Sequence, residues 1–215
     1  MNREVLRKLA NRLNAFRYSL YAPLYPLTRY FFKKARSRSL STLNELINNS
    51  NPSKKVLIVG CGDGQDLEFL RYDHHIYLTD FSRVMLDKAT TRAKGYGFSH
   101  IHAKTMSADD LQFENDSFDV VILNLIITVV SDHEAVVREA RRVLKSGGLI
   151  SVFDKSIDSR RPGLFISIIN FFTTLVATSI NVYLDGIFKK FNLEILDKRN
   201  LLLGGLFKSY LLKKS

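Results

Sequence analysis

The sequence predicts an α/β fold in which a mostly parallel sheet lies between layers of helices. Short apolar runs alternate with helical segments, and the run at residues 56–59 breaks into a turn with three glycines. Such alternation makes βαβ units with right-handed crossovers, whose ligand lies at the carboxyl ends of the central strands. With 215 residues and 46% hydrophobic content, the chain can bury the core of one compact domain.

The elements are expected in a regular order. The first twenty residues form an amphipathic helix, because one stripe at three- and four-residue steps holds Leu6, Leu9, Leu13, Phe16 and Leu20. The remaining helices are predicted near residues 27–48, 65–71, 82–95 and 132–145. The strands are predicted near residues 55–60, 75–80, 100–105, 118–124 and 148–154.

The glycine turn and an acidic residue indicate a nucleotide-like ligand. Gly60, Gly62 and Gly64 let the backbone approach a ligand closely, and Asp80, at the end of the next apolar run, can accept both ribose hydroxyl protons. The spacing differs from the G-x-G-x-x-G of dinucleotide folds. Asp66 follows the turn, and no Lys or Arg is near. An acidic turn repels phosphate and favours a cationic ligand.

Three downstream segments make a family resemblance specific. Together with the glycine turn, residues 79–89, 113–121 and 142–148 resemble the signatures of class I S-adenosylmethionine-dependent methyltransferases, in the family's order. The ubiquinone/menaquinone-type and bacterial phospholipid N-methyltransferase-like members are the most similar. The resemblance implies a three-layer Rossmann-like sheet, parallel with a closing antiparallel strand near Gly204 and Gly205, and an N-terminal helical lid. It also implies S-adenosyl-L-methionine as cofactor, with S-adenosyl-L-homocysteine as product.

The resemblance also implies a set of site residues. In the family, the glycine loop passes under the methionyl part of the cofactor, the acid after the second strand holds the ribose, and a later segment flanks adenine. The cofactor-binding positions carried over are Gly60, Cys61, Gly62, Gly64, Asp80, Phe81, Ser107, Ala108, Asp109 and Asn124. Two positions depart from the pattern: Ile58 replaces a frequent acid, and Ser107 replaces the usual adenine-binding Asp. Asp63, Asp66 or Asp109 are candidates to substitute. No metal site is expected.

The catalytic candidates are Tyr21, Tyr25, Asn124 and Asp154. The stretch Tyr21-Ala22-Pro23-Leu24-Tyr25 resembles a lid motif that covers cofactor and substrate in these members, although Pro26 replaces the family's Asp. The alternative is that both tyrosines are packing aromatics. Asn124 ends the fourth predicted strand, facing the expected methyl position, and Asp154 ends the fifth. Their alternatives are a strand-end cap and a surface ion pair.

The positive charge is concentrated at the N-terminus. The net charge is +11, and residues 1–39 hold ten basic residues against Glu4 alone, a net +9. This pattern favours an anionic membrane surface as a partner; the alternative is a lid helix with solvated charges. We divide the chain into a basic helical segment, 1–48, and a methyltransferase core, 49–215. The apolar stretch 163–180 is interpreted as a substrate-pocket or membrane-facing helix rather than a spanning one.

The leading hypothesis is methyl transfer to a lipid or lipophilic acceptor, such as phosphatidylethanolamine-type amine head groups, at a membrane surface. The alternatives are a soluble small-metabolite or RNA methyltransferase and a catalytically silent cofactor-binding subunit. Nucleic acid is disfavoured, because Asn124 lacks the following N-P-P turn typical of enzymes that methylate base nitrogens. A single cysteine predicts a reducing compartment, and we expect a cytoplasmic, membrane-associated protein, with a mitochondrial presequence as the minor alternative.

Overall fold

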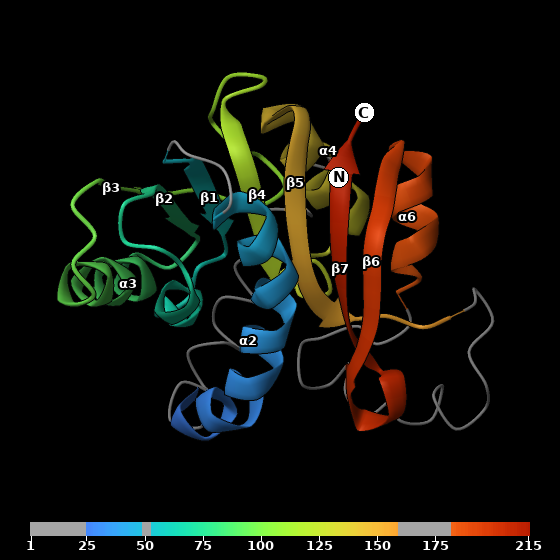
Figure 1. The fold of residues 1–215 in the computed structure, drawn as a ribbon, viewed down its shortest axis with the longest axis horizontal. Coiled ribbons are helices and arrows are strands. Elements are labelled where there is room, and N and C mark those ends of the chain that lie inside the picture. The colour runs from blue at the N-terminus through green and yellow to red at the C-terminus, as the bar shows by residue number, and fades with distance from the viewer. Residues whose placement is uncertain (1–24, 49–52, 159–181) are drawn as a thin grey trace, which may run out of the picture.

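The computed structural model describes residues 25–48, 53–158 and 182–215. They contain a seven-stranded sheet in the order β3-β2-β1-β4-β5-β7-β6 (Figure 1). The strands are β1 (Lys55–Val59), β2 (His75–Asp80), β3 (Ile101–Thr105), β4 (Phe118–Asn124), β5 (Leu144–Lys155), β6 (Leu193–Leu202) and β7 (Phe207–Lys214). Among them, β7 runs antiparallel to both of its neighbours, β5 and β6, and the other six strands point in the same direction. The predicted fold class is thereby confirmed.

Helices cover both faces of the sheet. They are α2 (Tyr25–Asn48), α3 (Arg83–Gly95), α4 (His133–Val143) and α6 (Leu184–Lys190), with short 3-10 helices η2 (Gln65–Phe69) and η3 (Leu203–Gly205). Buried residues of α2 and α3 pack with Val56 and Ile58 of β1, whereas those of α4 and α6 pack in the cluster that contains Leu57 and Val59. Alternate β1 side chains therefore enter opposite core layers. Figure 1 shows α2 in front of the sheet and α4 behind it.

The structure differs from the sequence prediction in three places. Residues 65–69 form a 3-10 helix instead of an α-helix. β5 begins at Leu144 rather than near residue 148, because Leu144 still pairs with Phe118 before a register shift. Helix α6, with seven residues, was not predicted. The helix predicted over 2–20 and the apolar stretch 163–180 lie outside the described residues.

Side-chain caps fix the helices that flank the site. The Ser82 hydroxyl accepts a hydrogen bond from the Met85 N–H at 3.4 Å at the start of α3, and Asp132 accepts one from Ala135 at 2.9 Å at the start of α4. The caps define where the two helices begin, α3 after the end of β2 and α4 after the end of β4. Within the described residues, no helix is long and apolar enough to span a bilayer.

Candidate functional site

The glycine turn joins β1 to η2 in left-handed backbone conformations. Gly60 has φ +63°, and a Cβ there would lie 2.5 Å from Ile126 Cδ1. Gly64 has φ +82°, and its Cβ would lie 3.0 Å from the Ala89 Cα. Only glycine satisfies both the φ angle and the close approach. The turn is thus packed tightly between α3 and the segment after β4.

Asp80 ties the end of β2 to this turn. Its Oδ2 accepts a hydrogen bond from the Gly62 N–H at 2.8 Å, and its Oδ1 accepts one from the Ser82 N–H at 2.8 Å. Burial raises the Asp80 pKa, and the hydrogen bonds from the Ser82, Gly62 and Phe81 backbone partly offset that rise. A carboxylate offers about four lone-pair positions, so these backbone donors do not exhaust its capacity to accept a hydrogen bond from a ligand. Phe81, beside it, is 49% exposed.

Cys61 has a structural environment. Its N–H donates to the Thr79 carbonyl at 2.9 Å, and its side chain is buried. Burial raises the pKa of the thiol, and the nearby carboxylates of Asp80 and Asp66 raise it further. A thiol held protonated is a poor nucleophile. Cys61 therefore fits the turn as a small side chain.

The segment after β3 lies beside Asp80. The Met106 N–H donates to the Asp80 carbonyl at 3.1 Å, which places residues 107–109 at the same edge of the sheet. Ala108 and Asp109 are buried, and the Ser107 hydroxyl donates to the Asp109 carboxylate. Asp63, in the turn, is paired with Arg92 of α3 at 2.7 Å. The predicted ribose and adenine residues are thus brought together.

Asn124 participates in a buried polar network that the sequence did not predict. Its Nδ2 donates to Asp66 Oδ1 at 2.9 Å, and Arg36 Nη1 of α2 donates to the same oxygen at 2.6 Å. All three side chains are buried. The sequence predicts Asp66 only as an acid of the turn and a substitute cofactor ligand, and nothing in it separates Arg36 from the other basic residues around it. Pairing across thirty positions is a consequence of the tertiary fold.

Asp154 is fully buried at the end of β5. Its oxygens accept hydrogen bonds from the Thr128 N–H at 3.1 Å, the Thr128 hydroxyl at 2.6 Å and the Lys155 N–H at 2.8 Å. Burial raises the Asp154 pKa and lowers the pKa of the neighbouring Lys155. These contacts hold the segment after β4, where Leu125 has φ +59°. The alternative prediction that Asp154 forms a surface ion pair is therefore wrong. Its buried carboxylate is held by three hydrogen bonds from the protein.

The two tyrosine candidates are not placed at the site. Tyr21 lies outside the described residues, and Tyr25 is the first residue of α2, with a side chain that is not described. Their predicted lid role stays a prediction.

The described side chains fit S-adenosylmethionine in one testable respect. Asn124 Oδ1 is buried and has no hydrogen-bond partner among the described residues. A buried acceptor of this kind costs free energy unless a donor reaches it, and the cofactor carries an ammonium group. Asp80 offers the acceptor sites that ribose hydroxyls need. Glycines, acceptors and acidic side chains at the ends of three parallel strands thus suit a cationic nucleoside.

Comparison with known proteins supports the same conclusion. Residues 57–152 match the family described as methyltransferase domain. The chain is 32% identical over 111 residues to phosphatidylethanolamine N-methyltransferase of Cereibacter sphaeroides, covering 50% of this chain and 54% of that protein. It is 29% identical over 114 residues to a ubiquinone/menaquinone biosynthesis C-methyltransferase of Vibrio campbellii, covering 51% and 44%. The matches thus span about half the length of these curated relatives.

A solved S-adenosylmethionine-dependent methyltransferase from Methanosarcina mazei shares the fold. Its TM-score is 0.63 at 20% identity, and the match covers 79% of this chain and 96% of that chain. The family match starts at β1 and ends within β5, so it contains the glycine turn, Asp80 and Asn124. Residues 57–152 thus match a methyltransferase domain, the fold is that of the solved S-adenosylmethionine-dependent methyltransferases, and these matches imply S-adenosylmethionine as the methyl donor.

Proposed function

We propose that the protein transfers a methyl group from S-adenosylmethionine to a lipid or lipophilic acceptor at a membrane surface, most concretely to the amine of a phosphatidylethanolamine-type head group. The observation that carries the proposal is the 32% identity to a phosphatidylethanolamine N-methyltransferase. The Vibrio relative, named for quinone biosynthesis, also supports a lipophilic acceptor.

We assign the cofactor-binding roles to the ends of β1, β2 and β4. Gly60, Gly62 and Gly64 leave room for the methionyl part, and Asp80 accepts hydrogen bonds from the ribose hydroxyls. Asn124 Oδ1 accepts one from the cofactor's ammonium group, which gives this buried oxygen a partner. Phe81 flanks the ribose, and Ser107, Ala108 and Asp109 flank adenine. The cofactor supplies an electrophilic methyl group on a positively charged sulfur.

The protein's own task is then to align the acceptor and exclude water. An amine needs only to lose a proton before attack, so a dedicated buried base is not required. Asp154 acts as a positioning residue in this scheme, because its carboxylate holds Thr128 and thereby the segment next to Asn124. Tyr21 and Tyr25 are assigned to closure over the acceptor.

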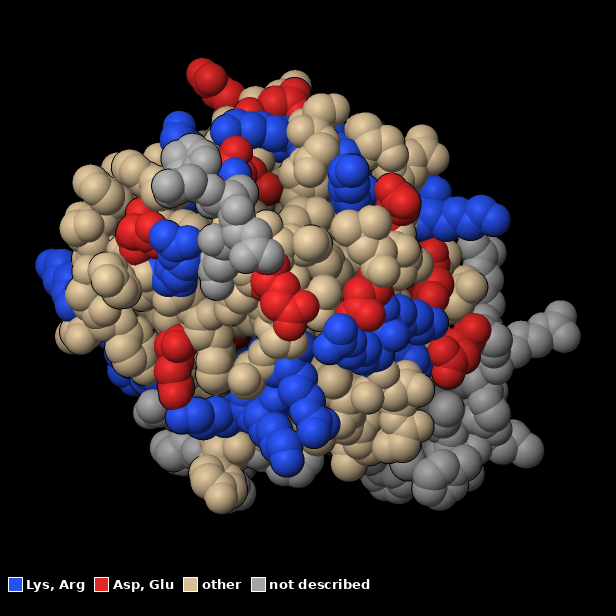
Figure 2. Space-filling view, in the orientation of Figure 1, with Lys and Arg blue, Asp and Glu red and all other residues tan. Residues whose placement is uncertain are grey.

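The basic N-terminal segment supplies the membrane affinity in this proposal. Residues 1–39 carry a net +9, and the rest of the chain carries the remaining +2 of the total. Within α2, Lys33, Lys34 and Arg38 are exposed. Figure 2 shows basic side chains gathered over the lower part of α2, whereas the two signs are mixed over β6. We therefore propose peripheral association of a cytoplasmic enzyme, with 1–48 as the membrane-facing segment and 49–215 as the methyltransferase core.

One labelling experiment tests this proposal. Purified protein is incubated with S-adenosylmethionine labelled in its methyl group and with vesicles that contain phosphatidylethanolamine. Matched samples receive phosphatidylcholine vesicles, total RNA or an aqueous metabolite extract. The expected result is label in the lipid fraction only when the free amine is present. Label in RNA or in aqueous metabolites alone would overturn the lipid assignment, and cofactor binding without any labelled product would favour a catalytically silent subunit.

A further inference from the structure

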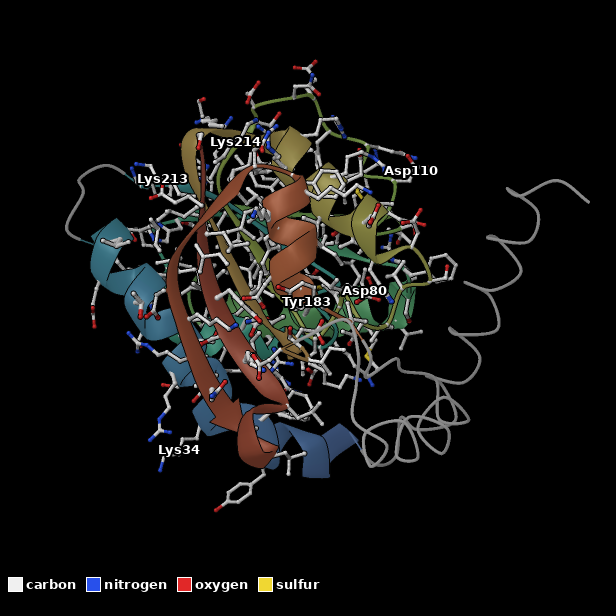
Figure 3. All side chains as sticks on the ribbon, turned by 90° about the vertical axis from the view of Figure 1, so that its right-hand side faces the viewer. Lys34, Asp80, Asp110, Tyr183, Lys213 and Lys214 are labelled. Carbon is white, nitrogen blue, oxygen red and sulfur yellow. The ribbon has the colours of Figure 1, made fainter. Side chains whose placement is uncertain are left out.

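Arg36 differs from Lys33, Lys34 and Arg38 of α2, which are exposed, because its side chain is buried in the protein. Its side chain is 11% exposed and that of its partner Asp66 is 4% exposed, at an Nη1–Oδ1 distance of 2.6 Å. Lys34, two residues earlier, projects away from the body of the protein (Figure 3). The ion pair of Lys33 with Glu68, between the same two elements, is half exposed on the lysine side. One buried and one exposed ion pair therefore connect α2 to η2.

The stability of the fold does not by itself account for the buried pair. Removing two charges from water costs about as much as their attraction returns, so a buried ion pair is weak support for stability. In some proteins a buried polar or ionic group fixes one arrangement of the chain. Here the fixed arrangement is that of η2, which directly follows Gly64, against α2.

Asp66 in turn fixes the orientation of Asn124. A carboxylate only accepts hydrogen bonds, so the amide nitrogen of Asn124 must face Asp66. The amide oxygen is then directed elsewhere, and it has no partner among the described residues. Without the charge on Asp66, the amide could turn and present its nitrogen instead. A cationic ligand group would then meet a donor rather than an acceptor.

We infer that Arg36 is a positioning residue, which acts through Asp66 to present Asn124 Oδ1 to a cationic group of the cofactor. The inference rests on the proposed function, because it takes the partner of that oxygen to be the cofactor's ammonium group. It makes α2 part of the cofactor site although Arg36 itself need not touch the ligand. Docking of α2 and binding of cofactor are then coupled, and such coupling is reciprocal.

The test compares two matched pairs of variants in cofactor-product binding. Arg36→Gln and Asp66→Asn break the buried pair. Lys33→Gln and Glu68→Gln make the same chemical changes in the exposed pair between α2 and η2. Binding of S-adenosylhomocysteine is measured by calorimetry. We expect about tenfold or greater weakening in the first two variants, as for a lost charge-assisted contact, and changes within about twofold in the other two.

Hydrogen exchange supplies the second readout, which does not depend on activity. In the wild type and in Lys33→Gln, S-adenosylhomocysteine should increase the protection of α2 backbone amides. In Arg36→Gln that increase should be absent, even at saturating ligand. Protection of β1 and β4 without ligand shows whether each variant is folded. If Arg36→Gln does not fold, Asp66→Asn gives the decision, because it removes the charge of the buried pair with almost no change of side-chain shape.

The outcomes separate this inference from the proposed function. If the wild-type protein does not bind S-adenosylhomocysteine, both fail. If it binds but the buried-pair variants bind equally well, or if ligand leaves α2 exchange unchanged in the wild type, only the role of Arg36 is overturned.

Discussion

The carboxylate of Asp80 accepts a hydrogen bond from the backbone N–H of Gly62 at 2.8 Å, so the end of β2 and the glycine turn after β1 form one unit. Parallel pairing of β1 with β2 brings the two ends together. The residue proposed to hold the ribose therefore also shapes the turn proposed to pass under the methionyl group. Changes at Asp80 should affect both.

Asp80→Ala is expected to weaken S-adenosylhomocysteine binding by about 1.5–3 kcal/mol, the typical loss for a hydrogen bond to a charged group. Calorimetric titration measures it. Asp87→Ala is the matched control, because Asp87 lies on the next helix in an exposed ion pair with Arg83. Equal affinity of wild type and Asp80→Ala would remove Asp80 from the proposed ligand set.

Gly60→Ala is expected to destabilise the protein more than Gly97→Ala. Both glycines have positive φ angles, but a Cβ at Gly60 would lie 2.5 Å from Ile126, whereas nothing lies within 4 Å at Gly97. The left-handed backbone alone costs about 1–2 kcal/mol, and overpacking adds about 1–3 kcal/mol. Urea unfolding of both variants separates the two terms. Equal losses would show that the Ile126 contact relaxes at little cost.

The sheet could be predicted because its determinants are local. β1, β2 and β4 are short apolar runs that end at a glycine, an acid and an amide, and parallel strands bring such ends together. The start of β5 could not be predicted in this way. Gly147 has φ +74° and lies in a sequence typical of a turn, yet Leu144 before it pairs with Phe118 across a register shift. Pairing with a neighbouring strand overrode local propensity.

Within the candidate site, the sequence could place only those residues that a motif identified. Asp80 and Asn124 are the last residues of β2 and β4, and the sequence predicts this position because each residue ends an apolar run. The Arg36–Asp66 pair was not predictable, because charged residues are rarely fully buried and Arg36 lies among exposed cations. For Asp154 the sequence indicated the strand end correctly, but burial depends on Thr128 folding over it.

His74 is expected to make stability depend on pH. It is buried, its Nδ1 accepts the Lys54 N–H at 3.2 Å, and its Nε2 has no hydrogen-bond partner among the described residues. Burial lowers its pKa below the usual 6.5; the nearby charges are Asp73 and Asp119, which raise it, and Arg71 and Lys54, which lower it. The unfolded chain therefore takes up a proton first as pH falls. The contribution of His74 to the free energy of unfolding is therefore constant above about pH 6.5. Below that pH the free energy of unfolding decreases, by at most about 1.4 kcal/mol per pH unit.

Urea unfolding of wild type and His74→Asn between pH 5 and 8 checks this dependence. The Asn amide oxygen can still accept the Lys54 N–H but does not titrate. The variant should show a shallower loss of stability on acidification. His102→Asn serves as control, because His102 is exposed on β3. If the slopes of wild type and His74→Asn coincide, His74 is not the group responsible.

Tyr21 and Tyr25 are expected to control turnover through lid closure. Replacement of either by Ala should lower kcat with the proposed acceptor, phosphatidylethanolamine, whereas replacement by Phe shows whether the hydroxyl or the ring matters. Binding of S-adenosylhomocysteine is measured in parallel to detect a general loss of folding. Tyr72→Ala is a suitable control, since Tyr72 is 68% exposed and follows η2. Unchanged turnover in all four variants would end the lid assignment.

The basic N-terminal segment is expected to bind anionic membranes. Replacement of Arg3, Arg7, Lys8 and Arg12 by Gln should reduce sedimentation with phosphatidylglycerol vesicles, because each basic residue near the surface contributes about 1 kcal/mol. Increasing salt should also weaken wild-type binding, since the Debye length is about 8 Å at physiological ionic strength. Burial of the stripe that contains Leu6 and Leu13 should leave some affinity at high salt.

The control for that experiment removes the same number of positive charges from another part of the protein. Lys88, Lys94, Lys104 and Lys213 are exposed and lie outside the N-terminal segment, so their replacement by Gln lowers the net charge equally. If position matters, this variant should sediment like the wild type, and both quadruple variants should bind S-adenosylhomocysteine normally. Equal losses in the two variants would mean that net charge alone drives binding. Wild-type protein that stays in the supernatant at low salt would remove the main physical support for a membrane-bound acceptor and favour a soluble one.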